Sequence, residues 1–358
     1  MRHTNYRMPA EWEPHAATWL AWPHYHGDWP GKFEPIPWVY AEIIRNLARH
    51  ERVELIVNDA VAERGARRIL DRANALSANI RFHRWPTNRV WIRDSGCIFA
   101  RDSVGELKAV KWRFNAWAKY SNWKNDEKIG SLMADQISTS RTKGAREMGH
   151  LNEVPPMYNG KRVVLEGGSI DVNGRGTLLT TEECLLSKIQ ERNPGMKRVD
   201  YEKVFAEYLG ATNVIWLGKG IYGDDTHGHV DDLTRFVSAN TVITMVEPNR
   251  KDKNHKPLRE NLQRLRSARD QDGKPLNIVE IPMPAPVVFE KRRLPASYAN
   301  FYIANGVVLV PVFNDPNDRI ALNTLAELFP SREMIPIYAG DLVWGLGTLH
   351  CMSQQQPA

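Results

Sequence analysis

Residues 298–338, YANFYIANGVVLVPVFNDPNDRIALNTLAELFPSREMIPIY, contain a complete strand–strand–helix–strand unit. Two apolar runs flank Asn305-Gly306, a dipeptide that favours a two-residue hairpin turn. Asp315-Pro316 then begins a helix whose apolar residues recur at helical spacing until Pro330 ends it. The predicted elements are strands at 298–304 and 307–312, a helix at 315–329 and a strand at 334–338.

The same order of elements recurs upstream. One copy has predicted strands at 163–170 and 177–181, a helix at 197–209 and a strand at 213–217. The next has strands at 229–237 and 241–247, a helix at 257–269 and a strand at 277–282. Two less regular copies lie in the first third of the chain, at 19–58 and 90–114.

These repeats indicate one domain over residues 1–358, because stacked modules share a core that none forms alone. We expect the stretch 115–156, which breaks the pattern, to be a long insertion that covers the site. If the modules stack around an axis, the matching ends of their first strands meet at one central place.

A glycine-rich bend, Gly345-Leu346-Gly347-Thr348-Leu349-His350-Cys351, places a thiol near the C-terminus. Glycines beside a thiol allow the backbone to approach a substrate closely, as covalent catalysis requires. Cys351 is therefore the candidate nucleophile. Cys97 and Cys184 have no chemical partner in the sequence, and we expect them to be small core residues.

Four polar residues lie in or beside the predicted first strands: Asp94, Glu166, His229 and Asn300. His229 and Asp231 are two positions apart, so on a strand they would project to the same face as a general acid/base and its charge partner. Several carboxylates around one thiol would raise its pKa unless a cation lies between them. A guanidinium is such a cation, and its planar N–H groups suit carboxylates.

Composition restricts the class of protein. The chain has 358 residues, 42% of them hydrophobic, and a formal net charge of +6. The basic stretch 250–269 is interrupted by acids and no nucleic-acid-binding motif accompanies it, so we expect no nucleic-acid partner. There is no signal peptide and no run of membrane-spanning length, and three cysteines form no disulfide pattern. We expect a cytoplasmic protein with free thiols.

Seven motifs, in consistent order from residue 8 to 357, resemble the agmatine deiminases and the related bacterial-type peptidylarginine deiminases. They are MPAEWEPH at 8–15, WIRDSG at 91–96, LEGGSI at 165–170, TEECLL at 181–186, GHVD at 228–231, ASYANFYIAN at 296–305 and HCMSQQQP at 350–357.

This resemblance implies the five-bladed α/β propeller of guanidine-modifying enzymes, with ββαβ modules around a pseudo-fivefold axis. It implies hydrolysis of a guanidine to a ureido product and ammonia through a covalent thiouronium on Cys351. Asp94 and Asp231 would hold the guanidinium, and His229 would act as acid and then base. Glu166 would hold the guanidinium or orient His229. The resemblance implies no metal or organic cofactor. It also implies a homodimer.

Further substrate contacts are expected from motif residues, namely Trp91, Arg93, Gly167, Asp225, Asn300 and Gly347. The substrate is a small cationic guanidino compound, and the full-length resemblance favours agmatine over peptidylarginine or free arginine. Asp171 or Asp225 could bind the distal ammonium of agmatine, and Arg175 a carboxylate. Positions that differ from the usual family pattern leave this choice open; they are Cys97, Ala118, Lys119, Asp171, His227, Leu346 and Thr348.

Two alternatives belong to other classes. His227, His229 and Asp231 have the spacing His-x-His-x-Asp, which binds metal in some hydrolases. The second alternative is a protein that binds guanidines without catalysis. Binding alone does not explain why the thiol, the imidazole and three carboxylates occur together.

Overall fold

The structure, a computed structural model, describes residues 6–142 and 153–358. It confirms the module predicted at 298–338. The hairpin strands β17 (Tyr302–Ala304) and β18 (Val307–Val312) are antiparallel, α8 (Pro316–Leu328) follows, and β19 (Glu333–Tyr338) pairs with β18 in parallel. Gly306 in the turn has a φ of +75°, which glycine adopts without strain.

Within the described residues, five sheets share one pattern, in which an antiparallel pair is extended by a parallel strand. Besides the module above, they comprise β4 (Ile98–Arg101), β5 (Leu107–Val110), α4 (Asp126–Thr142) and β6 (Glu153–Val154); β9 (Asp171–Val172), β10 (Thr177–Thr181), α5 (Glu182–Leu186), α6 (Arg198–Leu209) and β11 (Asn213–Leu217); β12 (Thr234–Phe236), β13 (Thr241–Val246), α7 (His255–Ser267) and β14 (Asn277–Pro282); and β20 (Ser353–Pro357), β1 (His15–Ala21), α1 (Ile36–Leu47), β2 (Arg52–Val57), α2 (Ala60–Arg72) and β3 (Ile80–Arg84). Two hairpins, β7 (Met157–Tyr158) with β8 (Lys161–Arg162) and β15 (Val288–Phe289) with β16 (Arg292–Arg293), stand apart.

The two ends of the chain share a sheet. β20 pairs antiparallel with β1, with Leu20 opposite Ser353, and β1 pairs in parallel with β2. The last strand of the chain therefore serves as the first strand of the first module. This pairing places Cys351 just before a first strand, in the same position as the polar residues of the other modules.

The predicted first strands begin too early, and this part of the prediction is wrong. In the structure, a short helical turn comes before the first strand of four modules. These turns are α3 (Ile92–Ser95), η1 (Gly167–Ser169), η2 (Val230–Asp232) and η3 (Tyr298–Asn300). Side-chain hydrogen bonds favour the turns, as where Ser297 Oγ accepts from the amide of Ala299 and Asp224 from the amides of Gly228 and His229. His229 and Asp231 thus lie at the start of a turn and not on one face of a strand.

Part of the stretch treated as an insertion completes the second module. Residues 126–142 form α4, which connects β5 to its parallel partner β6, as α8 connects β18 to β19. Residues 143–152 lie outside the described part of the chain. Trp117 and Tyr120, from the loop before α4, line a cavity that also contains Cys351.

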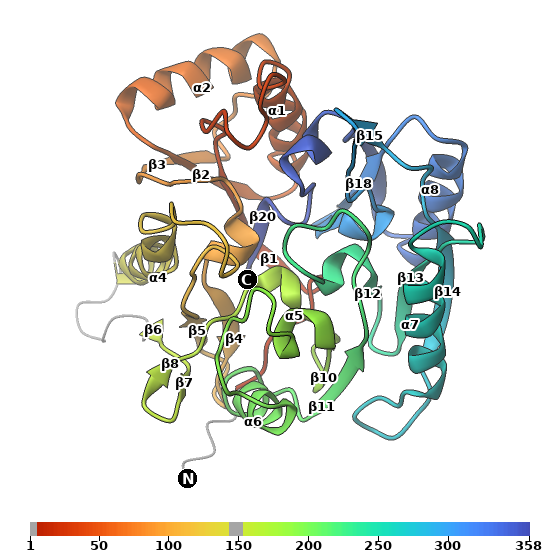
Figure 1. Cartoon of the computed structure of the whole chain (residues 1–358). Coiled ribbons are helices and arrows are strands. Elements are labelled where there is room, and N and C mark those ends of the chain that lie inside the picture. The colour runs from red at the N-terminus through yellow and green to blue at the C-terminus, as the bar shows by residue number, and fades with distance from the viewer. Residues whose placement is uncertain (1–5, 143–152) are drawn as a thin grey trace.

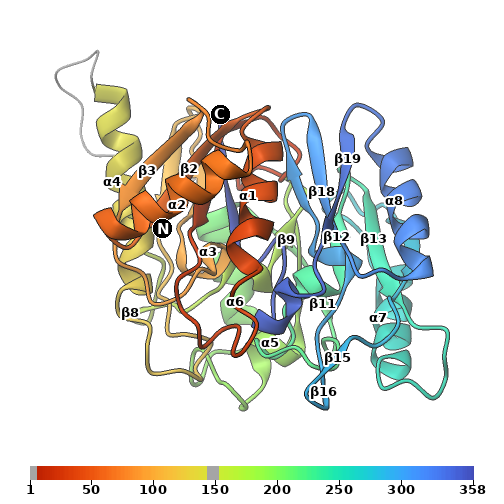
Figure 2. The same ribbon diagram turned by 90° about the horizontal axis from the view of Figure 1, so that it is seen from above.

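Helices surround the sheets, and β20 lies near the middle of the molecule (Figure 1). α7 contacts β13 and also β11 of the preceding module, and α8 contacts β19 and β14 in the same way, so both helices bridge neighbouring sheets (Figure 2). The turns touch in succession, α3 with η1, η1 with η2 and η2 with η3. Consequently the polar residues on these turns gather in one region. No helix in the described part has the length and apolarity to cross a bilayer.

Candidate active site

A cavity of about 150 Å³ opens beside the turns. Its inner end is formed by Trp91, Asp94, Gly347 and Cys351, all buried. The other lining residues that carry charge are Asp28, Arg89, Asp225 and Arg292, which with Tyr120 we call the outer end. The free thiols predicted for the chain are present, because Cys97, Cys184 and Cys351 form no disulfide.

Cys351 is held by Asn300. Asn300 Nδ2 donates to Cys351 Sγ at 3.1 Å, and Asn300 Oδ1 accepts from Thr348 Oγ1 at 2.8 Å and from the amide of His350 at 3.0 Å. A Cβ on Gly347 would come within 2.8 Å of the Trp91 ring and 3.2 Å of the sulfur, so only glycine fits there. The turn thereby presents the sulfur to the cavity.

Burial and acidic neighbours favour the protonated form of the Cys351 thiol. Burial raises the pKa of Cys351 well above its usual value, and Asp231, Asp232 and Asp94 raise it further, while the Asn300 hydrogen bond opposes them. Asp231 Oδ2 lies 3.7 Å from Sγ. A cation bound among these carboxylates would lower the pKa of the thiol, which is the arrangement expected from the sequence.

Asp94 faces the same cavity. Its Oδ2 accepts from Trp117 Nε1 at 2.9 Å and its Oδ1 accepts from the amide of Gly168 at 3.0 Å. Burial raises the pKa of Asp94 to about 6, and Asp231 and Glu166 add to the rise while His229 opposes it. The ionised form of Asp94 is therefore disfavoured relative to water, and a bound cation would offset that cost.

His229 is surrounded by acids. Its Nδ1 lies 4.0 Å from Asp94 Oδ1 and 4.0 Å from Asp231 Oδ1, and its Nε2 lies 3.7 Å from Glu166 Oε2. Burial opposes the charged form, but Asp94, Cys184 and Glu166 together raise the pKa of His229 well above its usual value. Neither ring nitrogen has a hydrogen-bond partner among the described residues. An imidazolium with open donors is suited to proton transfer to a ligand.

Gly168, rather than Gly167, is the glycine of the GG pair next to this cluster. A Cβ on Gly168 would lie 2.5 Å from His229 Nδ1 and 3.0 Å from Asp231 Oδ2. A Cβ on Gly167 would instead strike the backbone oxygen of Arg93 at 2.3 Å. Gly167 lets η1 pack on α3. Gly168 lets the His229 ring and the carboxylates of Asp231 and Asp94 come close together.

Glu166 has a partner that the sequence analysis missed. Arg192 Nε donates to Glu166 Oε1 at 3.1 Å, and both side chains are fully buried. Burial would raise the pKa of Glu166, but Arg192 and His229 lower it overall, so Glu166 remains ionised beside the imidazole. Cys184, expected to have no chemical partner, lies in this group: its sulfur is within 4.8 Å of a Glu166 oxygen and a His229 nitrogen.

The predicted substrate contacts separate into two sets. Trp91, Asp225 and Gly347 line the cavity, and Asn300 touches the sulfur. Arg93 and Gly167 do not line it: Arg93 NH1 donates to Gln355 Oε1 at 2.6 Å, and its NH2 lies 3.4 Å from Glu11 Oε2.

The candidates for binding the distal end of the substrate also separate. Asp171 is paired with Arg235 at 3.4 Å behind the site, and Arg175 is exposed away from the lining. Asp225 alone among them lines the cavity.

At the outer end the charges are paired with one another. Asp225 accepts from Lys119 Nζ, from Tyr120 OH at 2.5 Å and from Arg292 NH2 at 3.4 Å. Asp28 is paired with Arg89, and burial raises its pKa to about 7 despite this partner. This half of the pocket was largely missed, because Asp28 and Arg89 come from loops and Arg292 from the short strand β16, none of which a sequence motif marks.

The predicted metal-ligand set does not form in the described part of the chain. His227 Nε2 hydrogen-bonds with Ser187 Oγ at 3.1 Å. The group that does lie close together there is Glu166, Cys184 and His229, which share the space with Arg192. Since a guanidinium already neutralises Glu166, these three residues fit a divalent ion poorly.

Comparison with known proteins agrees with this geometry. The model of the Porphyromonas-type peptidyl-arginine deiminase family matches residues 7–357. The chain belongs to this family. An agmatine deiminase from Pseudomonas syringae pv. tomato is 34% identical over 380 residues, covering 100% of this chain and 97% of the relative.

Two solved structures of family members are similar throughout. Agmatine deiminase of Enterococcus faecalis superposes with a TM-score of 0.86 at 28% identity, covering 99% of this chain and 96% of that one. A cysteine-to-serine variant of C. jejuni agmatine deiminase with substrate bound gives a TM-score of 0.83 at 29% identity, covering 99% and 96%. The family resemblance predicted from the seven motifs is thus confirmed, as is a mixed α/β fold.

Several departures from the usual family pattern share a backbone feature. Ala118, Leu346 and His227 have φ values of +53°, +71° and +65°. Glycine and asparagine adopt this left-handed region readily, whereas other residues are strained there. These three residues therefore occupy strained backbone bends.

Proposed function

We propose that this protein hydrolyses agmatine to N-carbamoylputrescine and ammonia. The observation that supports it is the cluster at the inner end of the cavity. Asp94 and Cys351 line this end, Asp231 lies 3.7 Å from the Cys351 sulfur, and His229 lies 4.0 Å from both Asp94 and Asp231 behind the lining. A flat cation between these carboxylates satisfies their charge and places its carbon near the sulfur. Membership of a deiminase family and similarity to agmatine deiminases support the same reaction.

Substrate binding activates the nucleophile in this mechanism. Asp94 and Asp231 accept N–H bonds from the guanidinium, whose positive charge offsets the acids that raise the pKa of Cys351. His229 is already an imidazolium, so the thiol proton leaves to water, and the thiolate attacks the guanidinium carbon. Ammonia departs with a proton from His229, leaving a thiouronium on Cys351.

Hydrolysis of that intermediate reverses the proton transfer. His229, now neutral, takes a proton from a water that attacks the thiouronium carbon. The C–S bond breaks, and the ureido product and the thiol are released. Overall, one water is consumed and one ammonia formed. Glu166, kept ionised by Arg192, orients His229 and favours its charged form, and Asn300 fixes the sulfur.

Asp225 is the proposed partner of the distal ammonium, since it is the more exposed of the two acids that line the outer end. A second candidate is a guanidino substrate with a distal carboxylate, such as free arginine or a C-terminal peptidyl arginine. The observation that favours it is that Arg89 and Arg292 line the same end.

The five sheets with one strand order, bridged by their helices and touching through successive turns, support a five-bladed propeller around a pseudo-fivefold axis within a single domain. The family relationship supports a homodimer, and free thiols support a cytoplasmic location.

Ammonia release from agmatine, free arginine, methylarginines and an arginine peptide tests the proposal, compared as kcat/KM. We expect agmatine to give the largest value and activity to survive chelation. Higher values for arginine would favour the second candidate. Binding of agmatine without ammonia release would leave a guanidine-binding protein, and loss of activity with a chelator would restore a metal mechanism.

A further inference from the structure

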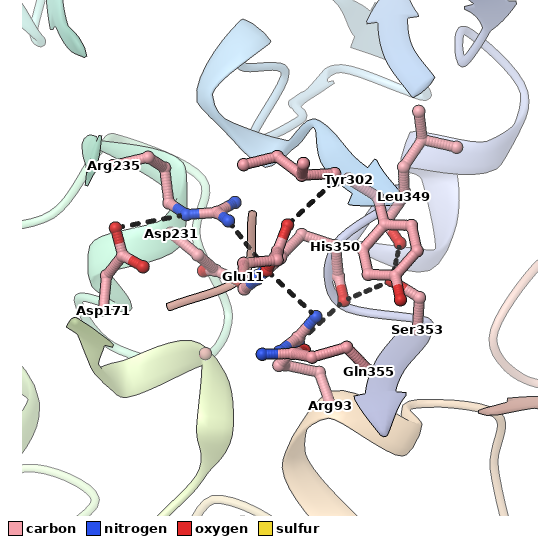
Figure 3. A network of polar contacts seen from close by, with 12 residues as sticks. Glu11, Arg93, Asp171, Asp231, Arg235, Tyr302, Leu349, His350, Ser353 and Gln355 are labelled. Carbon is pink, nitrogen blue, oxygen red and sulfur yellow. Dashed lines mark hydrogen bonds and ion pairs between the residues drawn. The ribbon is translucent and has the colours of Figure 1, made fainter. Parts of the chain in front are cut away.

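The imidazole of His350 lies between two carboxylates, those of Asp231 and Glu11 (Figure 3). Its Nδ1 is 2.7 Å from Asp231 Oδ2, and its Nε2 is 2.8 Å from Glu11 Oε2. The ring is 2% exposed. The sequence analysis assigned no role to His350 or Glu11, which are separated by almost the whole chain.

These contacts restrict the protonation of the ring. A neutral imidazole has one N–H donor, and an ionised carboxylate only accepts, so two ionised carboxylates can both be satisfied only by an imidazolium. Groups other than His350 favour the ionised form of both acids: burial raises the pKa of each, but Arg235 and Arg93 lower that of Glu11, and His229 and Arg235 lower that of Asp231.

Other charged groups lie near this ring. Glu11 Oε2 also lies 2.9 Å from Arg235 NH2 and 3.4 Å from Arg93 NH2, and Arg235 pairs with Asp171. Three carboxylates, Glu11, Asp171 and Asp231, thus lie close to two guanidinium groups, Arg93 and Arg235, and the His229 ring lies 4.0 Å from Asp231 Oδ1. An imidazolium at His350 has an acidic partner for each of its two N–H groups.

The backbone of His350 is fixed as well. Its amide donates to Asn300 Oδ1 at 3.0 Å, and its carbonyl oxygen accepts from Arg93 Nε at 3.3 Å. The side chain and main chain of this residue are thus anchored to η2, η3, α3 and the N-terminal segment. Its neighbour Cys351 shares that anchorage.

We propose that His350 is a buried, charged positioning residue that orients Asp231 for the guanidinium; this inference rests on the proposed function. His350 engages Asp231 Oδ2, while Oδ1 has no hydrogen-bond partner among the described residues and lies 4.0 Å from His229 Nδ1. One carboxylate oxygen is therefore held by the protein and the other is left for the ligand. His350 acts through Asp231 and does not touch substrate.

A binding cycle tests this coupling. All four proteins carry Cys351→Ser, which prevents turnover. They are Cys351→Ser alone, Cys351→Ser with His350→Gln, Cys351→Ser with Asp231→Asn, and Cys351→Ser with both further substitutions. The affinity of each for agmatine is measured by calorimetry. Glutamine can keep one hydrogen bond but not the charge. We expect His350→Gln to weaken binding about 100-fold when Asp231 is present, and by less than about 3-fold when Asp231 is already asparagine. Equal losses in the two backgrounds, or none, would overturn the proposal.

A matched control is His83→Gln. His83 is also buried and also bonded to a carboxylate, with its Nε2 2.6 Å from Glu54 Oε2, but it lies on β3 away from the cavity. It should leave agmatine affinity unchanged. A loss comparable to that of His350→Gln would indicate general destabilisation instead of positioning.

Long-range ¹H–¹⁵N NMR of the histidine rings gives a readout independent of the substrate. In the Cys351→Ser protein at neutral pH, the His350 ring, assigned by its loss in His350→Gln or by its response to Glu11→Gln, should show two protonated nitrogens. One unprotonated nitrogen would contradict the proposal even if the glutamine variant failed to fold. If no guanidino compound binds the Cys351→Ser protein while the ring is charged, the proposed function fails and the protonation of His350 stands.

Discussion

The two ends of the pocket use their charges differently. Behind the inner end, His229 has both ring nitrogens, and Asp231 one oxygen, without hydrogen-bond partners in the described part of the chain. At the outer end Asp225 accepts from three side chains and Asp28 is paired with Arg89, although Asp28 Oδ2 and Arg89 Nε also have no hydrogen-bond partner there. The inner end therefore has more unpaired atoms to offer a ligand, whereas most charged groups of the outer end already have a protein partner.

Buried polar atoms that lack a hydrogen-bond partner reduce the stability of the fold. An unsatisfied buried polar group costs about 1–3 kcal/mol. The pKa values of Asp94 and Cys351 are raised, which means that their charged forms are disfavoured until a cation binds. The charged groups at the inner end are thus less stable than they would be in water, and a bound guanidinium stabilises them. Variants at the two ends can test this contrast.

The largest effect is expected from Cys351→Ser, which removes the nucleophile. We expect kcat to fall by about 10⁴-fold or more, because the covalent path is lost. Agmatine affinity, measured by calorimetry, should stay within about tenfold, because the acids that hold the guanidinium remain. Turnover at more than about a hundredth of the wild-type rate would contradict the assignment of Cys351.

His229→Gln should have the second largest effect. It removes the acid and base of the proposed mechanism, and we expect a loss of about 10²–10⁴-fold in kcat. Single-turnover kinetics should show both adduct formation and adduct hydrolysis slowed. The matched control is His227→Gln, two residues away on the same loop, whose ring bonds to Ser187; an equal loss there would point to loop disruption.

Asp94→Asn should increase stability with a defined pH dependence. The pKa of Asp94 is raised to about 6 in the folded protein, so ionised Asp94 disfavours folding, an effect that is absent below about pH 4 and complete above about pH 6. The substitution should therefore raise the free energy of unfolding by about 2 kcal/mol at pH 8 and leave it unchanged at pH 4, as measured by denaturant unfolding at the two pH values.

Glu166→Gln should change the free energy of unfolding in the opposite direction to Asp94→Asn. Because Arg192 and His229 lower the pKa of Glu166, its ionised form stabilises the fold above its unfolded pKa, and this stability is lost as the pH falls. The variant should be destabilised at pH 8, as followed by thermal unfolding. A stability change of the same sign in the two variants would contradict the electrostatic account of the inner end.

Asp225→Asn should have a smaller effect, confined to binding. It removes the outer acid that we assign to the distal ammonium, so we expect KM for agmatine to rise about tenfold with kcat within about threefold. Arginine, if turned over, should gain relative to agmatine. A large fall in kcat with unchanged KM would show that the two ends are not separate in function.

The smallest effect is expected at a strained bend. Ala118 has a φ of +53°, so Ala118→Gly should stabilise the protein by about 1 kcal/mol. Ala206→Gly, in the middle of α6, should destabilise it by about 1 kcal/mol. Denaturant unfolding of both variants checks this, and stabilisation by the second change would contradict the assignment to backbone strain.

The inner end was largely predictable from sequence, because Cys351, His229 and Asp94 each lie in a short motif with glycine or polar neighbours. Arg192 and His350 were not, since their partners Glu166, Asp231 and Glu11 are distant in the chain. The repeating ββαβ order and strands such as β10, β11 and β14 were predicted with correct bounds. The first strands were not, because side-chain hydrogen bonds within the turns override the apolar pattern.

The central claim is that the Cys351 sulfur forms a bond to the guanidinium carbon. Mass spectrometry of protein quenched in acid during agmatine turnover tests it directly. The account predicts an adduct with the mass of agmatine less ammonia, located on the peptide that contains Cys351. Steady turnover without any such adduct, or an adduct on Cys184 in its place, would contradict it.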